Sequence, residues 1–205
     1  MNTKKELSLL CKKLYDKGFS PAKSGNISYK QENSILITPS GFCLGDVEEK
    51  DFAVVDLDGN LLGSSQKPSS EKIMHIEIYK QRPDVKCILH IHAPKITAFA
   101  VAQIPINKAG LAEAVFYDLC NVPIAKYATP SSKELALNVS ELAKNNNCIL
   151  MANHGVIICG SDMKDAYFRL EDLYGVVETY LWATVLGRIT ELTPEQQQEL
   201  IKLRG

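Results

Sequence analysis

The sequence lacks the features that would assign the protein to several large classes. No two of its six cysteines form a C-x-x-C pair, and most stand among apolar residues, which is typical of reduced core cysteines in a cytoplasmic protein. No stretch approaches the roughly 20 consecutive apolar residues of a membrane span, and no long apolar run follows the start of the chain, so neither a membrane protein nor a secreted one is predicted. The formal net charge of -1 gives no indication of a nucleic-acid or membrane partner.

The chain also has no linker, internal repeat or low-complexity segment, and no P-loop or dinucleotide-binding fingerprint. Its 205 residues are enough for one domain with a sizeable core, so a single domain is expected over residues 1–205. The Asp58-Gly59 pair indicates a hairpin, whereas other strands are separated by helical segments. This mixture predicts one sheet covered by helices, without the regularity of a parallel βαβ sheet.

Hydrophobic periodicity gives the order of the elements along the chain. We expect helices over residues 5–16, 95–102, 111–119, 131–144 and 163–186, and a last helix that begins at Thr193-Pro194. Strands are expected after residues 24–26 and over residues 34–38, 52–56, 122–126, 148–152 and 156–159. The helix over 163–186 carries more apolar residues than one contact layer needs, and core burial and a subunit interface explain this equally well. The residues concerned are Tyr167, Leu170, Tyr174, Val177, Tyr180 and Leu181.

The stretch over residues 68–94 is the part around which the rest of the chain is organised. Helical spacing begins near its start, where the hydroxyl of Ser69 or Ser70 is a natural N-cap. A proline then ends the helix, and a buried strand over residues 85–92 closes with His90 and His92. Side chains at i and i+2 of a strand project from the same face, with Cα atoms about 6 to 7 Å apart, so both imidazoles can reach one ion.

His154 is the candidate for a third metal ligand, because it stands beside Gly155 at a break between two apolar runs. A neutral imidazole suits zinc, and three protein ligands with one open position are typical of a catalytic site. For a single histidine, a hydrogen-bonded structural role is the better interpretation, and we assign that role to His75. For His90 and His92 together with His154, the pattern favours a metal site.

Three short loops share a chemistry that suits an anion. They are Ser24-Gly25-Asn26, Pro39-Ser40-Gly41 and Pro68-Ser69-Ser70. Each offers backbone N–H groups and small hydroxyls, and the last adds the positive end of a helix dipole. Each loop alone is typical of a plain turn, but together they predict a phosphate site. Glu71 stands where this site meets the metal site, so it is the best candidate for a catalytic base, although alone it would be a solvated first-turn glutamate.

Taken in order, several segments of the chain resemble the class II aldolase/adducin family. They are SGNIS, ITPSG, KPSSE, RPDVKCILHIHAP, VPIAKYATPSSKELA and NHGVI, and the resemblance spans about residues 5–190. It implies a three-layer αβα sandwich around a central, largely antiparallel β-sheet. It also implies a fourfold-symmetric homotetramer with active sites between the subunits.

The resemblance implies a site and a reaction as well. A divalent metal, usually zinc with Mn2+, Co2+ or Fe2+ as alternatives, is expected on His90, His92 and His154, with Glu71 as an additional ligand until substrate displaces it. The phosphate of a sugar substrate is expected on Gly25, Asn26, Ser40, Gly41, Ser69 and Ser70. The reaction expected is cleavage of a ketose 1-phosphate to dihydroxyacetone phosphate and an aldehyde through an enediolate, with Glu71 moving the proton.

One segment departs from the pattern of the family's aldolases. They carry a catalytic tyrosine after the His-x-His strand, whereas the matching position here is Leu111 or Ala112. Tyr117 lies a full turn away. The family's methylthioribulose-phosphate dehydratases use a glutamate in this region, which Glu113 resembles, so Glu113 is a second candidate catalytic residue. Decarboxylases and epimerases of sugar phosphates are further alternatives, whereas a noncatalytic adducin-like interaction module is disfavoured because such modules lack the metal histidines.

Overall fold

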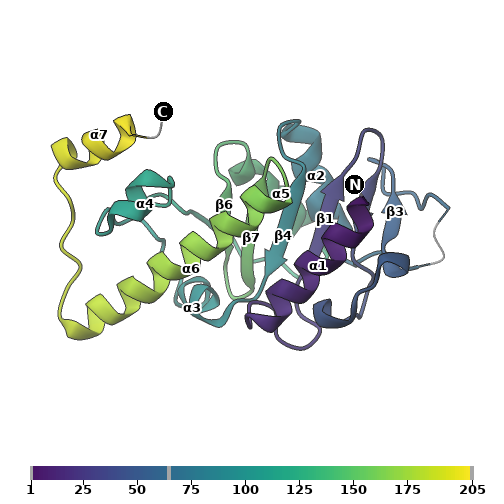
Figure 1. The fold of residues 1–205 in the computed structure, drawn as a ribbon, viewed down its shortest axis with the longest axis horizontal. Coiled ribbons are helices and arrows are strands. Elements are labelled where there is room, and N and C mark those ends of the chain that lie inside the picture. The colour runs from purple at the N-terminus through teal and green to yellow at the C-terminus, as the bar shows by residue number, and fades with distance from the viewer. Residues whose placement is uncertain (1, 64–65, 204–205) are drawn as a thin grey trace.

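The computed structural model describes residues 2–63 and 66–203, and these contain a 7-stranded sheet in the order β3-β2-β1-β4-β7-β6-β5 (Figure 1). The strands are β1 (Asn26–Lys30), β2 (Ile35–Ile37), β3 (Ala53–Val55), β4 (Cys87–Ile91), β5 (Ile124–Ala125), β6 (Cys148–Met151) and β7 (Gly155–Gly160). Neighbouring strands are antiparallel except β5 and β6, which are parallel. The prediction of a largely antiparallel sheet is confirmed.

Helices cover both faces of this sheet and give the predicted three layers. One face packs against α1 (Thr3–Asp16), α3 (Pro94–Ala102) and α6 (Met163–Leu186), and the other against α2 (Lys72–Gln81) and α5 (Lys133–Ala143). In Figure 1, α1 and α6 cross the front of the sheet. The other helices are α4 (Ala112–Phe116), α7 (Pro194–Lys202) and the 3-10 turns η1 (Leu44–Asp46) and η2 (Glu49–Asp51). Among the described helices, none combines the length and the apolar character needed to cross a membrane.

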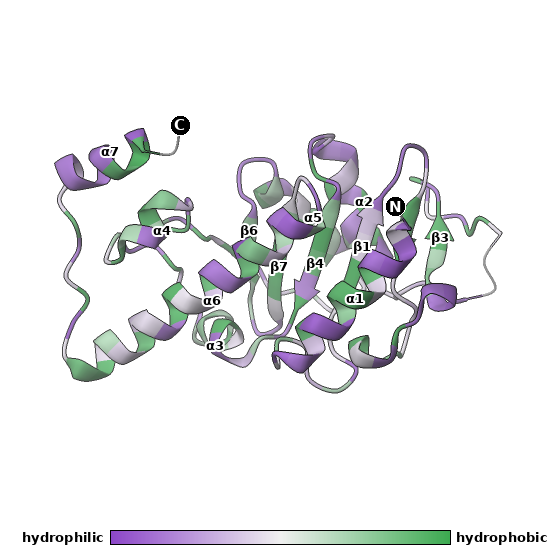
Figure 2. Ribbon diagram, viewed as in Figure 1, coloured by the Kyte–Doolittle hydropathy of each residue, from purple (hydrophilic) through white to green (hydrophobic). Residues whose placement is uncertain are grey.

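The two hydrophobic cores follow from the alternation of side chains along the strands. In β4, Leu89 packs in the core beneath α1 and α6, and its neighbour Ile88 packs in the core beneath α2 and α5. Both β4 and β7 are buried over their whole length, and Figure 2 colours them mostly hydrophobic. Central strands with helices on both faces require such continuous apolar runs.

The prediction of a serine N-cap for α2 is wrong. The helix begins at Lys72, with Glu71 at the N-cap position and no side-chain cap. Pro68, just before the expected cap, forms an isolated bridge with Pro39, so the chain is still in a β-bridge there. A turn must then follow, closed by the Lys72 N–H donating to the Ser69 carbonyl oxygen at 3.2 Å, before helical bonding can begin.

Most of the apolar side chains singled out on α6 pack inside this chain. Four of the six side chains singled out from the sequence are buried and two pack partly buried against the same core. Exposed apolar side chains instead lie near the C-terminal end of α6, which Figure 2 colours hydrophobic. Trp182, Val185 and Leu186 are 62%, 73% and 88% exposed.

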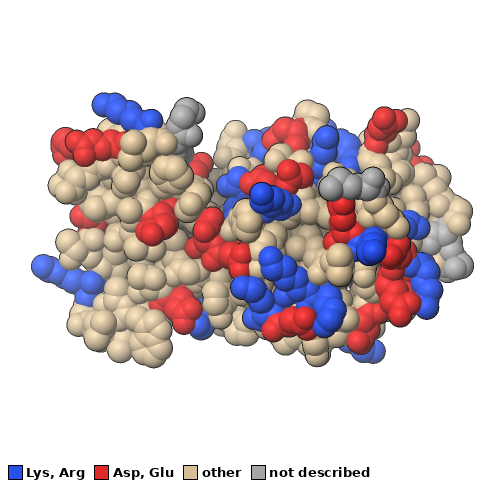
Figure 3. All heavy atoms as spheres, in the orientation of Figure 1, with Lys and Arg blue, Asp and Glu red and all other residues tan. Residues whose placement is uncertain are grey.

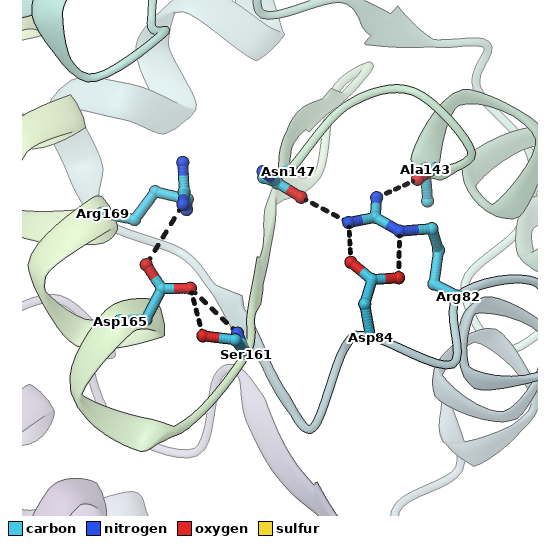
Figure 4. Close-up of polar contacts among 7 residues, drawn as sticks. All are labelled: Arg82, Asp84, Ala143, Asn147, Ser161, Asp165 and Arg169. Atoms are coloured by element: carbon cyan, nitrogen blue, oxygen red, sulfur yellow. Dashed lines mark hydrogen bonds and ion pairs between the residues drawn. The ribbon is translucent and has the colours of Figure 1, made fainter. Parts of the chain in front are cut away.

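Arg82 ties the end of α2 to the neighbouring elements. Its guanidinium forms a bidentate pair with Asp84 and donates to the Ala143 carbonyl oxygen and to Asn147 Oδ1 (Figure 4). These contacts bind α2 to the end of α5 and to the residue just before β6. Because Asp84 lies shortly before β4, they also connect the segment that enters β4 to these elements.

Candidate active site and metal centre

Three histidines from two neighbouring chain segments meet at the end of the sheet. His90 lies in β4, His92 follows that strand, and His154 belongs to the turn between β6 and β7. Their ring centroids are 4.7, 4.8 and 5.0 Å apart. One ligand nitrogen from each ring lies within 4.8 Å of the others, so the three rings could hold one metal ion.

The turn that carries His154 depends on two residues with special conformations. Asn153 adopts a left-handed conformation with φ 56°, which asparagine tolerates better than most residues. Gly155 has no side chain where a Cβ would lie 2.6 Å from the Ile91 carbonyl oxygen, 3.2 Å from His92 and 3.3 Å from His90. The glycine therefore lets β7 approach β4 closely enough for the imidazoles to converge.

The histidines are held in the form that binds a metal. His90 Nδ1 lies 3.2 Å from the Val156 carbonyl oxygen, to which its N–H donates, so its Nε2 is free to face the other rings. Burial, followed by repulsion from a protonated His90, lowers the pKa of His92 to about 3 and that of His154 to about 4, against the opposing charge of Glu71. Both rings are therefore neutral at pH 7, as metal ligation requires.

The carboxylate of Glu71 lies against this triad. Its Oε2 is 3.1 Å from His90 Nε2 and its Oε1 is 3.6 Å from His154 Nε2. Burial alone would raise the pKa of Glu71, but interactions with His90 and His154 and a hydrogen bond from Asn26 outweigh it and hold this pKa below its usual range. Glu71 is therefore ionised and able to accept a proton.

These residues fit a divalent metal by their chemistry. Three imidazoles with a nearby carboxylate form a donor set suited to zinc and to similar ions. Within the described part of the chain, Glu71 Oε1 and His154 Nδ1 are buried and have no hydrogen-bond partner. Buried polar atoms usually have one, and a cation held by the triad would give the carboxylate oxygen a partner.

One pocket of about 240 Å³ joins the triad to the three predicted anion loops. All six residues expected to bind phosphate line it, together with Glu71, His92 and His154. They are Gly25, Asn26, Ser40, Gly41, Ser69 and Ser70. Along the chain, β1 and β2 separate the first loop from the second, and β3 separates the second from the third. The structure thus brings the three loops together beside Glu71, the candidate base.

Not every loop amide in this pocket is available to an anion. The Ser40 N–H donates to the Lys67 carbonyl oxygen at 2.9 Å, and the Ser69 N–H donates to the Thr38 carbonyl oxygen at 3.0 Å. At these two serines the hydroxyl, rather than the amide, is the group that can face a ligand.

Glu113, the second candidate catalytic residue, does not lie at this pocket. It lies on α4 with an exposed side chain and does not line the pocket. Burial, with contributions from the charges of Glu171 and Glu113, raises the pKa of Asp172, which places Glu113 near α6 instead. Within this chain, Glu113 is therefore not part of the pocket.

The pocket also contains residues that the sequence patterns did not single out as ligands. Lys23 and Ser131 line it, and Ser131 adopts a left-handed conformation with φ 66°. Two signals in the sequence could have found them. Lys23 directly precedes an anion loop, and Pro130-Ser131-Ser132 repeats the Pro-Ser-Ser sequence of residues 68–70.

Comparison with known proteins identifies the family. A family model described as Class II Aldolase and Adducin N-terminal domain matches residues 5–181. The chain is 33% identical over 202 residues to a 3-oxo-tetronate 4-phosphate decarboxylase of Haemophilus influenzae, covering 96% of this chain and 95% of that protein. It is 34% identical over 170 residues to an L-fuculose phosphate aldolase of Methanocaldococcus jannaschii, covering 83% of this chain and 91% of that protein. A solved L-fuculose 1-phosphate aldolase matches with a TM-score of 0.89 and 28% identity, over 98% of this chain and 94% of that one.

Fold and site together define the class as an aldolase-like αβα sandwich with a histidine triad that could bind a metal. The chain belongs to the class II aldolase and adducin N-terminal domain family. Its relatives are named for two different reactions, an aldol cleavage and a decarboxylation.

Proposed function

We propose that the protein is a metal-dependent lyase that breaks a carbon–carbon bond of a phosphorylated sugar through the enediolate of dihydroxyacetone phosphate. The observation that carries this proposal is the position of Glu71, whose carboxylate lies between the histidine triad and the anion loops. Proton transfer at a carbon next to a phosphate-bearing ketone requires a base placed between those two groups.

The residues of the pocket would have two roles, phosphate binding and proton transfer. The three loops would bind the substrate phosphate, and the nearby Lys23 would add a positive charge to that end. Phosphate held at one end fixes which carbon-bound hydrogen faces Glu71. Glu71 would protonate the enediolate after cleavage and remove the same proton in the synthetic direction.

His90, His92 and His154 would hold the divalent ion, with zinc first and Mn2+, Co2+ or Fe2+ as alternatives, and Glu71 would be an additional ligand until substrate binds. Bound there, the ion would supply Lewis-acid stabilisation for the negative charge that develops on the substrate oxygens. Neutral imidazoles leave the full charge of the ion available for this purpose.

The two reactions named for the relatives converge on the same enediolate. A ketose 1-phosphate and a 3-oxo-tetronate 4-phosphate both contain a phosphate-bearing carbon, a ketone and a hydroxyl-bearing carbon in a row. Breaking the next bond releases an aldehyde from the first and CO2 from the second, and leaves dihydroxyacetone phosphate in both. Aldol cleavage of a ketose 1-phosphate is our first assignment, and decarboxylation is the second because similarity to a decarboxylase covers 96% of the chain.

The experiment that separates these assignments measures both products from each substrate. Metal-loaded protein is incubated with a panel of ketose 1-phosphates and with 3-oxo-tetronate 4-phosphate, and dihydroxyacetone phosphate, aldehyde and CO2 are quantified. Aldehyde and dihydroxyacetone phosphate in equal amounts would support the aldolase, whereas CO2 with dihydroxyacetone phosphate would support the decarboxylase. A dehydrated diketone phosphate would support the dehydratase, and an isomerised sugar phosphate the epimerase. Absence of any turnover together with absence of bound metal would support a noncatalytic adducin-like module.

The proposal includes a cytoplasmic homotetramer with active sites at subunit interfaces. Exposed Trp182, Val185 and Leu186 support an interface near the end of α6, and such an assembly would allow Glu113 of a neighbouring subunit to reach the pocket. We propose no nucleic-acid or membrane partner, because the net charge is -1 and acidic and basic side chains are interspersed on the face shown in Figure 3.

A further inference from the structure

Behind Glu71, buried polar side chains form a continuous chain of hydrogen bonds. Asn26 Nδ2 donates to Glu71 Oε2 at 2.9 Å, and His75 Nε2 lies 2.6 Å from Asn26 Oδ1. On its other side, His75 Nδ1 lies 2.7 Å from Ser28 Oγ, which lies 2.8 Å from the Tyr79 hydroxyl oxygen. Asn26 is 6% exposed, Ser28 and His75 are 0% exposed, and Tyr79 is 1% exposed.

Two regular elements build this chain of bonds. Asn26 and Ser28 are alternate residues of β1 and project from the same face. Glu71, His75 and Tyr79 follow one another at intervals of four along the start and body of α2, so they form one stripe on the helix. The hydrogen bonds alternate between side chains of β1 and side chains of α2. The Glu71 carboxylate is at the end of this chain of bonds that lies at the pocket.

The direction of every bond is determined by the chemistry of the partners. Asn26 presents its NH2 group to Glu71 Oε2, so its carbonyl oxygen faces His75. That oxygen only accepts, so His75 must carry its proton on Nε2. Burial, followed by the charge of His90, lowers the pKa of His75 to about 3, so the ring is neutral and Nδ1 accepts from Ser28. The single Ser28 hydrogen is used there, so Ser28 Oγ must accept from the Tyr79 hydroxyl at 2.8 Å. The Lys86 carbonyl oxygen, 3.2 Å from the same hydroxyl, is the longer and competing acceptor.

We propose that His75, held as its Nε2–H tautomer by Ser28 and Tyr79, is a positioning residue that locks the Asn26 carboxamide with its NH2 group on Glu71. The hydrogen bond from Asn26 then holds the Glu71 carboxylate in the orientation in which it faces the substrate carbon. This inference rests on the proposed function of Glu71 as the base, and His75 itself touches neither substrate nor metal.

The alternative orientation of Asn26 shows why a lock is needed. Rotating the carboxamide by half a turn would place its carbonyl oxygen against the Glu71 carboxylate and leave Glu71 Oε2 without this donor. The C=O and NH2 groups of a carboxamide have nearly the same shape, so packing alone does not distinguish the two orientations. The hydrogen bond with His75, on the side of Asn26 away from Glu71, does distinguish them. His75 makes the wrong orientation unfavourable by presenting a donor where the NH2 group would otherwise lie.

The test compares His75→Phe, which removes the donor but keeps a ring, with His75→Gln, which keeps an N–H near the position of Nε2. Solvent exchange of the carbon-bound proton of dihydroxyacetone phosphate is measured on zinc-loaded protein, with rates normalised to bound zinc. We expect kcat for exchange to fall about 10- to 100-fold in His75→Phe, as misplaced catalytic groups typically cause, and by more than any change in KM. His75→Gln should recover most of that loss.

A matched pair of buried serines keeps the test informative if His75→Phe does not fold. Ser28→Ala removes the group that holds the His75 tautomer, and Ser140→Ala removes an equally buried hydroxyl that bonds only within α5, to the Leu137 carbonyl oxygen. We expect slower exchange in Ser28→Ala and unchanged exchange in Ser140→Ala. Equal kcat values in wild type, His75→Phe and Ser28→Ala would overturn the proposal, and so would loss of zinc from either variant.

A spectroscopic measurement tests the tautomer without any substrate. In zinc-loaded wild type labelled with 15N, the His75 ring, assigned by its disappearance in His75→Gln, should show a protonated Nε2 and an unprotonated Nδ1. The opposite tautomer, or a doubly protonated ring at pH 7, would overturn the proposal. Wild type that exchanges no proton but shows the expected tautomer would overturn the function of Glu71 rather than the arrangement of His75.

Discussion

Substitution of Gly155 by alanine should weaken metal binding without unfolding the protein. The added Cβ would lie 2.6 Å from the Ile91 carbonyl oxygen, so β7 and β4 must separate locally by about 0.8 Å to reach an ordinary contact of 3.4 Å. The contacts at 3.2 Å with His92 and 3.3 Å with His90 require both rings to shift as well. Metal–ligand distances tolerate changes of only about 0.2 Å, so the triad would lose its convergence.

We expect the metal affinity of Gly155→Ala to fall ~10- to 100-fold, the range found when groups that orient metal ligands are disturbed. Isothermal titration of metal-free protein with zinc, together with competition against a chelator, gives this ratio. Gly175→Ala is the matched control, because an added Cβ on this glycine of α6 meets no heavy atom within 4 Å. That variant should bind zinc as wild type does and gain up to about 1 kcal/mol of stability. Equal affinities in wild type and Gly155→Ala would refute the argument that Gly155 sets the spacing of the triad.

Three further predictions address the ligands, the buried histidine and the assembly. His92→Ala should retain the fold but lose most bound metal and all turnover, and metal analysis that finds equal content in wild type and variant would contradict the assignment. Because the pKa of His75 is about 3 when folded and 6.5 ordinarily, only the unfolded chain gains this proton as pH falls below 6.5. Metal-free wild type should then lose about 1.4 kcal/mol of stability per pH unit more than His75→Gln between pH 6 and 4 in denaturant titrations, and parallel slopes would disprove this. Light scattering should show a tetramer that Trp182→Glu dissociates, and a fully active monomeric wild type would rule it out.

The parts of the site that depend on local spacing could be predicted from the sequence. His90 and His92 are two residues apart on a buried strand, so their common face follows from the pleat alone. The limits of α6 were predicted correctly at residues 163–186, because a capping Asp162 and the terminal Gly187 enclose a long helical period. The chemistry of the three anion loops was also visible, since each contains serine and two of them contain glycine.

The features that depend on long-range contacts were not predictable in this way. The start of α2 is displaced by the pairing of Pro68 with Pro39, which no helix-capping pattern reveals. The link from Asn26 to His75 crosses 49 residues, so the sequence indicated only that His75 is hydrogen-bonded and not what its bonds position. Glu113 matched a family pattern, but it does not line the pocket within this chain, so a local motif alone did not place it at the site.

The central claim is that Glu71, beside a metal held by three histidines, moves a proton at the carbon of a phosphate-bearing ketone. The most direct test is to incubate zinc-loaded wild type and Glu71→Gln with dihydroxyacetone phosphate in deuterated water and to follow loss of the carbon-bound proton by NMR. We predict exchange of one of the two hydrogens on the hydroxyl-bearing carbon in wild type, and a rate reduced ~10²- to 10⁴-fold in Glu71→Gln with zinc content unchanged. No exchange in zinc-loaded wild type, or undiminished exchange in Glu71→Gln, would contradict it.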